Sequence, residues 1–126
     1  MTATYNFILN QGSDKTLRFV IKSMLAYYCQ KVYKRIQLNG YSAAMQLRKF
    51  VEDQDAVLTL TTSNGKLMIE ENIGYLTAYF SNEDTGSLEA GDYVYDLEIQ
   101  MQEENKVYRI LEGTVTVSPE VTKVNG

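Results

Sequence analysis

The side chains that most often carry out chemistry in proteins are nearly absent from this sequence. Its 126 residues contain no histidine and a single cysteine, Cys29. Without an imidazole, a Ser-His-Asp triad, a Cys-His pair and a histidine general base are all excluded. One thiol cannot form an intrachain disulfide, and without histidine it cannot complete the usual zinc or copper ligand sets. We therefore expect no enzyme activity, no cofactor and no metal.

Carboxylates are the remaining candidates for chemistry. Acidic clusters occur at residues 52–55 and 82–84, and neither has the spacing of a calcium-binding loop. Asp96 and Glu98 alternate on one predicted strand face and could in principle serve as an acid and base on a glycoside. Outward charges on a sheet are more often simply solvated, so we interpret these acids as surface residues and Cys29 as a small buried hydrophobe.

The elements that would position these residues are predominantly strands. Apolar and polar residues alternate with period two, most clearly over residues 92–101. Further strands are predicted at 5–9, 16–22, 42–48, 57–61, 66–70, 74–80 and 107–117. Seven or eight short antiparallel strands separated by turns predict an all-β sandwich of one domain over residues 1–118, followed by a short tail at 119–126.

Turn residues predict how some strands are connected. Strands 92–101 and 107–117 are expected to form an antiparallel hairpin, with a bulge near Glu112 and Gly113 where the inward parity changes. Asn64 and Gly65 predict a second hairpin between strands 57–61 and 66–70, because both residues tolerate positive φ. Residues 81–91 have too few apolar positions for a strand and are expected to form a connection with one helical turn.

Residues 24–36 do not follow the strand pattern. Leu25, Cys29, Val32 and Ile36 recur with helical spacing, whereas the tyrosines of the same segment would also suit a strand. We predict a helical or irregular excursion here, which an all-β core does not need.

Charge is distributed unevenly along the chain. Residues 1–50 hold eight bases and one acid, a net charge of +7, and residues 51–126 hold four bases and fifteen acids, a net charge of −11. If early and late strands are neighbours, these charges interleave on the folded surface. Otherwise one end of the domain is basic and another acidic, and copies could associate head to tail. Nucleic acid binding is disfavoured because a protein of pI ≈ 4.8 repels phosphates.

Export and membrane signals are missing from the sequence. No run approaches the roughly 18 apolar residues that span a bilayer, and the first twenty residues lack the order of a signal peptide. We expect a soluble product made without export and without membrane insertion.

The C-terminal third carries a recognisable pattern. Residues 90–123 read AGDYVYDLEIQMQEENKVYRILEGTVTVSPEVTK, and the upstream segments 6–19 and 36–49 read NFILNQGSDKTLRF and IQLNGYSAAMQLRK. Together they resemble small virion proteins of tailed bacteriophages and prophages, in the same order along the chain. The resemblance implies an immunoglobulin-like β-sandwich that acts as a structural subunit of the tail, baseplate or fibre adaptor, and it marks no active site.

Partners follow from the same resemblance. The expected partners are other copies of the chain and neighbouring tail proteins, in a virion assembled in the host cytoplasm, with no small-molecule substrate. The sequence departs from the family pattern between Lys22 and Arg35, so we place the partner contact there. The candidate residues are Tyr27, Tyr28, Lys31, Tyr33, Lys34 and Arg35. Two alternatives remain open: a head decoration or head-tail connector subunit, and a carbohydrate-binding module that recognises the host surface through exposed tyrosines.

Overall fold

The computed structural model describes residues 2–20, 41–70, 74–101 and 105–122. Within these ranges the chain forms β1 (Ala3–Thr4), β2 (Phe7–Asn10), β3 (Lys15–Val20), β4 (Tyr41–Arg48), β5 (Leu58–Thr61), β6 (Leu67–Glu70), β7 (Tyr75–Phe80), α3 (Asn82–Gly86), β8 (Gly91–Met101) and β9 (Lys106–Ser118). The predicted all-β sandwich is confirmed, as is the helical turn between residues 81 and 91. The excursion predicted at 24–36 lies outside the described residues.

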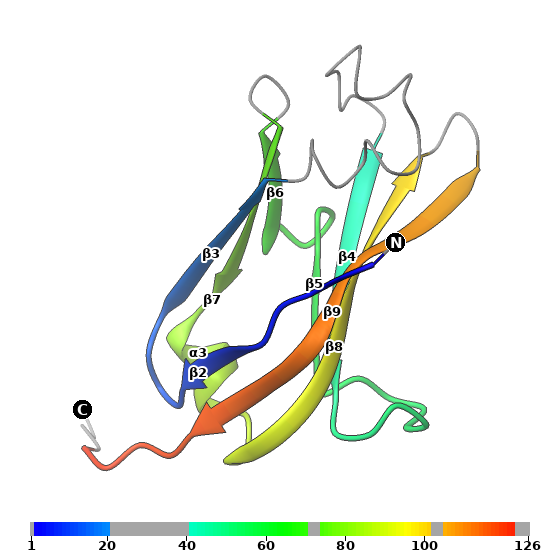
Figure 1. Ribbon diagram of the computed structural model, residues 1–126. Coiled ribbons are helices and arrows are strands. Elements are labelled where there is room, and N and C mark those ends of the chain that lie inside the picture. The colour runs from blue at the N-terminus through cyan, green and yellow to red at the C-terminus, as the bar shows by residue number, and fades with distance from the viewer. Residues whose placement is uncertain (1, 21–40, 71–73, 102–104, 123–126) are drawn as a thin grey trace.

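Two sheets form the sandwich. One has the order β9-β8-β4-β5, with β1 and β2 both paired to β9, and the other has the order β3-β7-β6. Figure 1 shows the two sheets as separate layers, with β3 at the outer margin of the smaller one. The orders β3-β7-β6 and β9-β8-β4-β5 correspond to strands B-E-D and G-F-C-C′ of immunoglobulin-like domains, so the sandwich has an immunoglobulin-like topology.

Pairing of the N-terminal strands differs from the prediction. The expected strand at 5–9 is broken into β1 and β2, and both run parallel to β9 in a fold that we expected to be antiparallel throughout. At the break, Tyr5 N–H donates to Glu112 O and Asn6 Oδ1 accepts from Thr114 N–H, so the ladder is continued by a side chain. Period-two patterning identifies a strand but does not state its direction.

The predicted hairpin between residues 57 and 70 is wrong. The Asn64-Gly65 turn is present, but β5 pairs with β4 and β6 pairs with β7, so the turn carries the chain from one sheet to the other. Gly65 has φ +80°, as the turn requires. Asn64 N–H donates to Thr61 Oγ1 and its carboxamide bonds the backbone of the preceding strand, which stabilises the turn without any cross-strand pairing.

The predicted hairpin of β8 and β9 is confirmed, and its bulge lies two residues earlier than expected. The register changes between Leu97, opposite Leu111, and Glu98, opposite Arg109. Ile110 is the extra residue, so Ile110 and Leu111 are both almost fully buried. The bulge thereby keeps the arginine exposed while the rest of β9 continues to fill the core.

One hydrophobic core lies between the sheets. Alternate residues of the central strands are inaccessible, as the patterning of β4 and β8 predicts. The largest fully buried side chains are Phe80, Leu9, Met45, Leu47, Leu60, Leu76, Leu97, Ile99, Ile110 and Leu111. Residues from all long strands therefore share a single core, which holds the outer faces of both sheets rigidly. In the described part of the chain, no helix has the length and apolar character needed to cross a membrane.

Candidate interaction surface

Chemistry-bearing side chains are not gathered into a reaction site in the described ranges. No group of three or more histidine, cysteine, aspartate or glutamate residues there could hold a metal ion. Asp96 and Glu98 project from the outer face of β8, and Cys29 lies outside the described residues. The features that stand out are large apolar side chains exposed on the surface.

Two adjoining apolar side chains are displayed on the turn between β4 and β5. Phe50 is 57% exposed and Val51 is 77% exposed. The turn is closed by hydrogen bonds from Phe50 N–H to Asp53 Oδ2 and from Asp53 N–H to Phe50 O, at 3.1 Å each. Arg48 Nε donates to Asp53 O at 3.0 Å and ties the turn to the end of the strand. The exposed pair is therefore held in a defined position, which lowers the entropy that a partner contact would cost.

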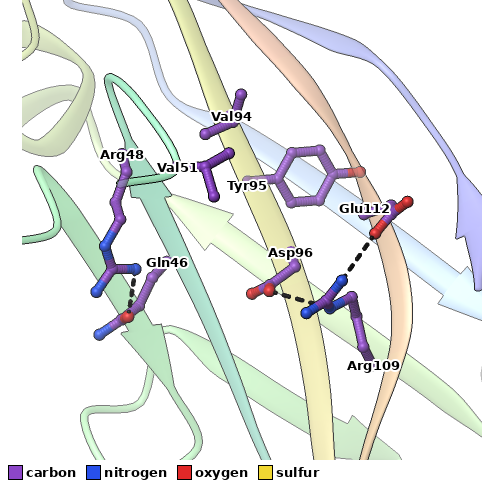
Figure 2. A pocket seen from close by; sticks show the side chains of 8 residues that line it. All are labelled: Gln46, Arg48, Val51, Val94, Tyr95, Asp96, Arg109 and Glu112. Carbon is purple, nitrogen blue, oxygen red and sulfur yellow. Dashed lines mark hydrogen bonds and ion pairs between the residues drawn. The ribbon is translucent and has the colours of Figure 1, made fainter. Parts of the chain in front are cut away.

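A shallow hollow of about 200 Å³ adjoins this turn on the outer face of the six-stranded sheet. Figure 2 shows its lining, Gln46, Arg48, Val51, Val94, Tyr95, Asp96, Arg109 and Glu112, drawn from β4, β8, β9 and the turn. The valines supply apolar lining, and charged side chains from separate strands surround them. We call Phe50, Val51 and the lining of this hollow the outer-sheet surface.

Charged groups of the outer-sheet surface are arranged in fixed pairs. Arg109 Nε lies 3.3 Å from Asp96 Oδ2, and its Nη1 donates to Glu112 Oε1 at 3.3 Å. On the opposite side of the hollow, Arg48 Nη1 donates to Gln46 Oε1 at 2.8 Å. The surface thus presents a mixed pattern of charge around an apolar spot, a composition common at the centres and rims of protein interfaces.

The early and late halves of the chain are interleaved by the fold. Strand β3 pairs with β7, and β4 lies between β5 and β8, so early strands neighbour late ones. Of these late strands, β8 carries the acids Asp92, Asp96 and Glu98. Arg18 illustrates the result, with its Nη2 3.7 Å from Glu70 Oε1 and its guanidinium 5.4 Å from the Tyr75 ring centroid. Among the described residues, the uneven charge of the sequence is therefore partly balanced on the surface.

Asp84 is more than the solvated acid that we predicted. It is the third residue of α3 and completes a capping box with Ser81, in which each side chain bonds the other's backbone N–H. Its Oδ1 also accepts from Lys66 Nζ at 2.5 Å, which joins the helix to the start of β6. Burial alone would raise its pKa, but the hydrogen bonds from Lys66 and Ser81 outweigh that effect and lower the pKa. The spacing S-x-x-D was the available signal in the sequence.

Tyrosines divide between the core and the surface. Tyr93 and Tyr95 are buried, and burial raises the pKa of both phenols. Tyr93 lies near the start of β8, and its hydroxyl donates to the carbonyl oxygen of Glu89, four residues upstream, at 2.6 Å. This contact is the tyrosine corner of immunoglobulin-like domains. Tyr79 is 46% exposed on the outer face of β7. The tyrosines of the described residues thus include core residues, such as Tyr93 and Tyr95, and exposed ones, such as Tyr79.

The partner contact predicted from the sequence was centred on Tyr27, Tyr28, Lys31, Tyr33, Lys34 and Arg35, and all six lie outside the described residues. The structure therefore does not test that prediction. Sequence reasoning missed Phe50 and Val51, because a short apolar pair followed by acids reads equally well as the end of a strand. The signal that could have revealed them is the acidic run 52–55, which requires the preceding apolar residues to lie near the surface.

Comparisons with known proteins identify no family. No family model matches the chain, and no curated protein matches it. Among solved structures, InlP of Listeria monocytogenes is similar over 93% of this chain, with 15% identity and a TM-score of 0.45, and the match spans 28% of InlP. CopC of Methylosinus trichosporium OB3b is similar over 65% of this chain and 67% of its own, with 13% identity and a TM-score of 0.38. Likenesses this distant give no basis for transferring a function.

Proposed function

We propose that this chain is a non-enzymatic structural subunit of a tailed-phage particle, in the tail, baseplate or fibre adaptor, and that it acts by protein-protein assembly. Its partners would be other copies of the chain and neighbouring virion proteins, joined in the host cytoplasm. Head decoration or head-tail connection is the alternative position. The resemblance of residues 90–123 to such proteins supports the phage assignment.

The observation that carries the assembly role is the exposure of Phe50 and Val51 on a hydrogen-bonded turn. Large apolar side chains held in a rigid position beside a hollow are the anchors that dominate binding energy at many protein interfaces. The surrounding arginine and carboxylate pairs would set orientation more than affinity. An immunoglobulin-like sandwich suits this role, because it holds its surface loops on a rigid core.

The glycan-binding alternative receives less support from the arrangement of the tyrosines. The Arg18 guanidinium lies over the Tyr75 ring, and Tyr93 and Tyr95 are in the core. A sugar-binding platform needs several open ring faces side by side, and the described part of the three-stranded sheet offers only Tyr79 in the open.

The test is complementation of a phage genome from which the coding sequence has been deleted. The double variant Phe50→Ser, Val51→Ser should fold with an unchanged melting temperature but lower the yield of complete particles by about tenfold or more. The matched control is Val107→Ser, which removes another exposed apolar side chain, 53% accessible, from the strand β9. Wild-type particle yield with the double variant would contradict the proposed role of this surface.

A further inference from the structure

The free edge of β5 is covered by one side chain. Strand β5 is the last strand of the six-stranded sheet, and a free edge presents N–H and C=O groups that invite another chain to pair. Asn64 covers two of these groups, because its carboxamide accepts from Thr61 N–H and donates to Thr59 O, both at 3.0 Å. The same side-chain oxygen accepts from Lys66 N–H at 3.0 Å. One amide group therefore holds both ends of the turn between β5 and β6.

The residue that follows Asn64 makes this amide chemically unstable. A backbone nitrogen that has lost its proton can attack the carboxamide carbon of the preceding asparagine, and glycine permits this most readily because no Cβ shields its nitrogen. Asn64 and Gly65 are both exposed, and a Cβ built on Gly65 would have no atom within 4 Å. Among the described residues, Gly65 N–H donates to no acceptor. The attacking nitrogen is therefore open to solvent and is not held by another contact.

The hydrogen bonds of the carboxamide oppose the attack, because they hold the side chain to the backbone of the turn. They lie at the surface, where water competes with them and local opening costs little free energy. We therefore expect the folded turn to slow the reaction without preventing it.

We propose that Asn64 is a site of spontaneous deamidation and that its conversion uncovers the edge of β5. The Gly65 nitrogen gives its proton to a base in the solvent and forms a bond to Cγ of Asn64. The bond from Cγ to Nδ2 breaks, and Nδ2 takes up a proton and leaves as ammonia. Water then opens the resulting succinimide ring at either carbonyl, which yields aspartate or isoaspartate. No group is oxidised or reduced, and water is the only co-reactant.

Both products lose the contacts that cover the edge. The donor to Thr59 O is gone, and a carboxylate oxygen in its place would repel that carbonyl. In isoaspartate, the oxygen that accepted from Thr61 and Lys66 becomes part of a lengthened main chain, so the turn loses its closure. We expect a less stable chain that associates through β5. The proposal concerns the covalent chemistry of the chain itself, so it can fail or hold independently of the proposed virion function.

The test follows the whole chain during incubation in mildly alkaline buffer, with a parallel sample in urea. Tryptic peptide 50–66 contains Asn64 as its only asparagine, so mass spectrometry separates it from the Asn-Gly pairs at 39–40 and 125–126. This peptide should convert to two acidic products in both samples. Gly65→Ala should slow conversion by about tenfold, equivalent to roughly 1.4 kcal/mol of activation free energy, and the urea sample removes any effect of strain in the turn. Ser63→Ala, which keeps the Asn-Gly pair, should convert as the wild type does.

The consequence is measured on the converted protein. Incubated wild type should show a lower urea midpoint and a larger mass in light scattering than fresh wild type, whereas incubated Asn64→Gln should match its own fresh sample. An intact amide in the folded chain, after complete conversion in urea, would contradict the site. Unchanged mass and midpoint of the converted wild type would contradict the uncovering of the edge, as would an equal change in Asn64→Gln, which would assign the effect to another residue.

Discussion

The hydroxyl of Tyr95, at the centre of β8, donates a hydrogen bond to the backbone carbonyl of Tyr5 at 2.5 Å. The two residues are 90 positions apart in the sequence. Strand β9 pairs with β8, which contains Tyr95, and with β2, which follows Tyr5. Tyr5 occupies the break between β1 and β2, where its carbonyl points toward the sheet. The contact therefore fastens the N-terminal segment at the one place where its ladder is interrupted.

Replacement of Tyr95 by phenylalanine should lower the free energy of unfolding by about 1–2 kcal/mol, because the carbonyl of Tyr5 loses its donor in a partly buried place. Urea denaturation should show a lower midpoint with an unchanged slope. Tyr79→Phe is the control, since its hydroxyl is exposed and lies 3.4 Å from Asp14 Oδ1. Equal stability of the two variants would mean that the Tyr95 hydrogen bond does not stabilise the fold.

Gly113 makes the same junction possible. A Cβ atom there would overlap the carbonyl oxygen of Tyr5, so Gly113→Ala requires the backbone of the N-terminal segment to move. We expect a loss of about 2 kcal/mol or more and faster amide exchange in β1 and β2. Gly86→Ala is the matched control, because the nearest atom to its Cβ would be at an ordinary 3.8 Å. Protected β1 and β2 amides in Gly113→Ala would contradict this account.

Asp84 should make stability depend on pH. Its pKa is lowered from 3.8 in the folded state, so the unfolded chain binds more protons in acid. The stabilisation is therefore complete above the unfolded pKa and is lost as pH falls through the folded pKa. Asp84→Asn should cost about 1–2 kcal/mol at neutral pH and flatten the dependence between about pH 5 and 2. Denaturant midpoints measured across this pH range test the prediction, with Glu83→Gln at the exposed neighbouring residue as the control. An unchanged pH dependence of stability in Asp84→Asn would rule out the ion pair of Asp84 with Lys66 as the origin of that dependence.

Asn64 should protect the protein from association. Asn64→Ala leaves Thr61 N–H and Thr59 O unpaired at the edge of β5, so we expect a loss of about 1 kcal/mol and a concentration-dependent increase in mass by light scattering. Ser63→Ala alters the same turn without touching the edge and should remain unchanged in mass. If the mass of Asn64→Ala does not exceed that of the wild type at high concentration, the carboxamide stabilises the turn but does not guard the edge.

The sequence was informative where a local rule decides the outcome. Alternation located the inward residues of β4 and β8. The change of inward parity along β9 predicted a bulge, but parity alone does not say whether the extra residue lies beside Arg109 or beside Gly113. The partners of a strand are not local. The Asn64-Gly65 turn fits a hairpin or a crossing between sheets equally well, and what distinguishes the two is that β5 pairs with β4 while β6 pairs with β7. Exposed apolar residues such as Phe50 likewise depend on the surrounding fold.

The most direct test of the proposed function is the location of the chain in purified particles. Mass spectrometry of denatured, gradient-purified virions should detect it as a stoichiometric component, and a cryo-EM map of the same particles should contain the sandwich in repeated copies with Phe50 and Val51 at a protein contact. Absence of the chain from the particles, together with normal particle assembly after its deletion, would contradict the proposed function.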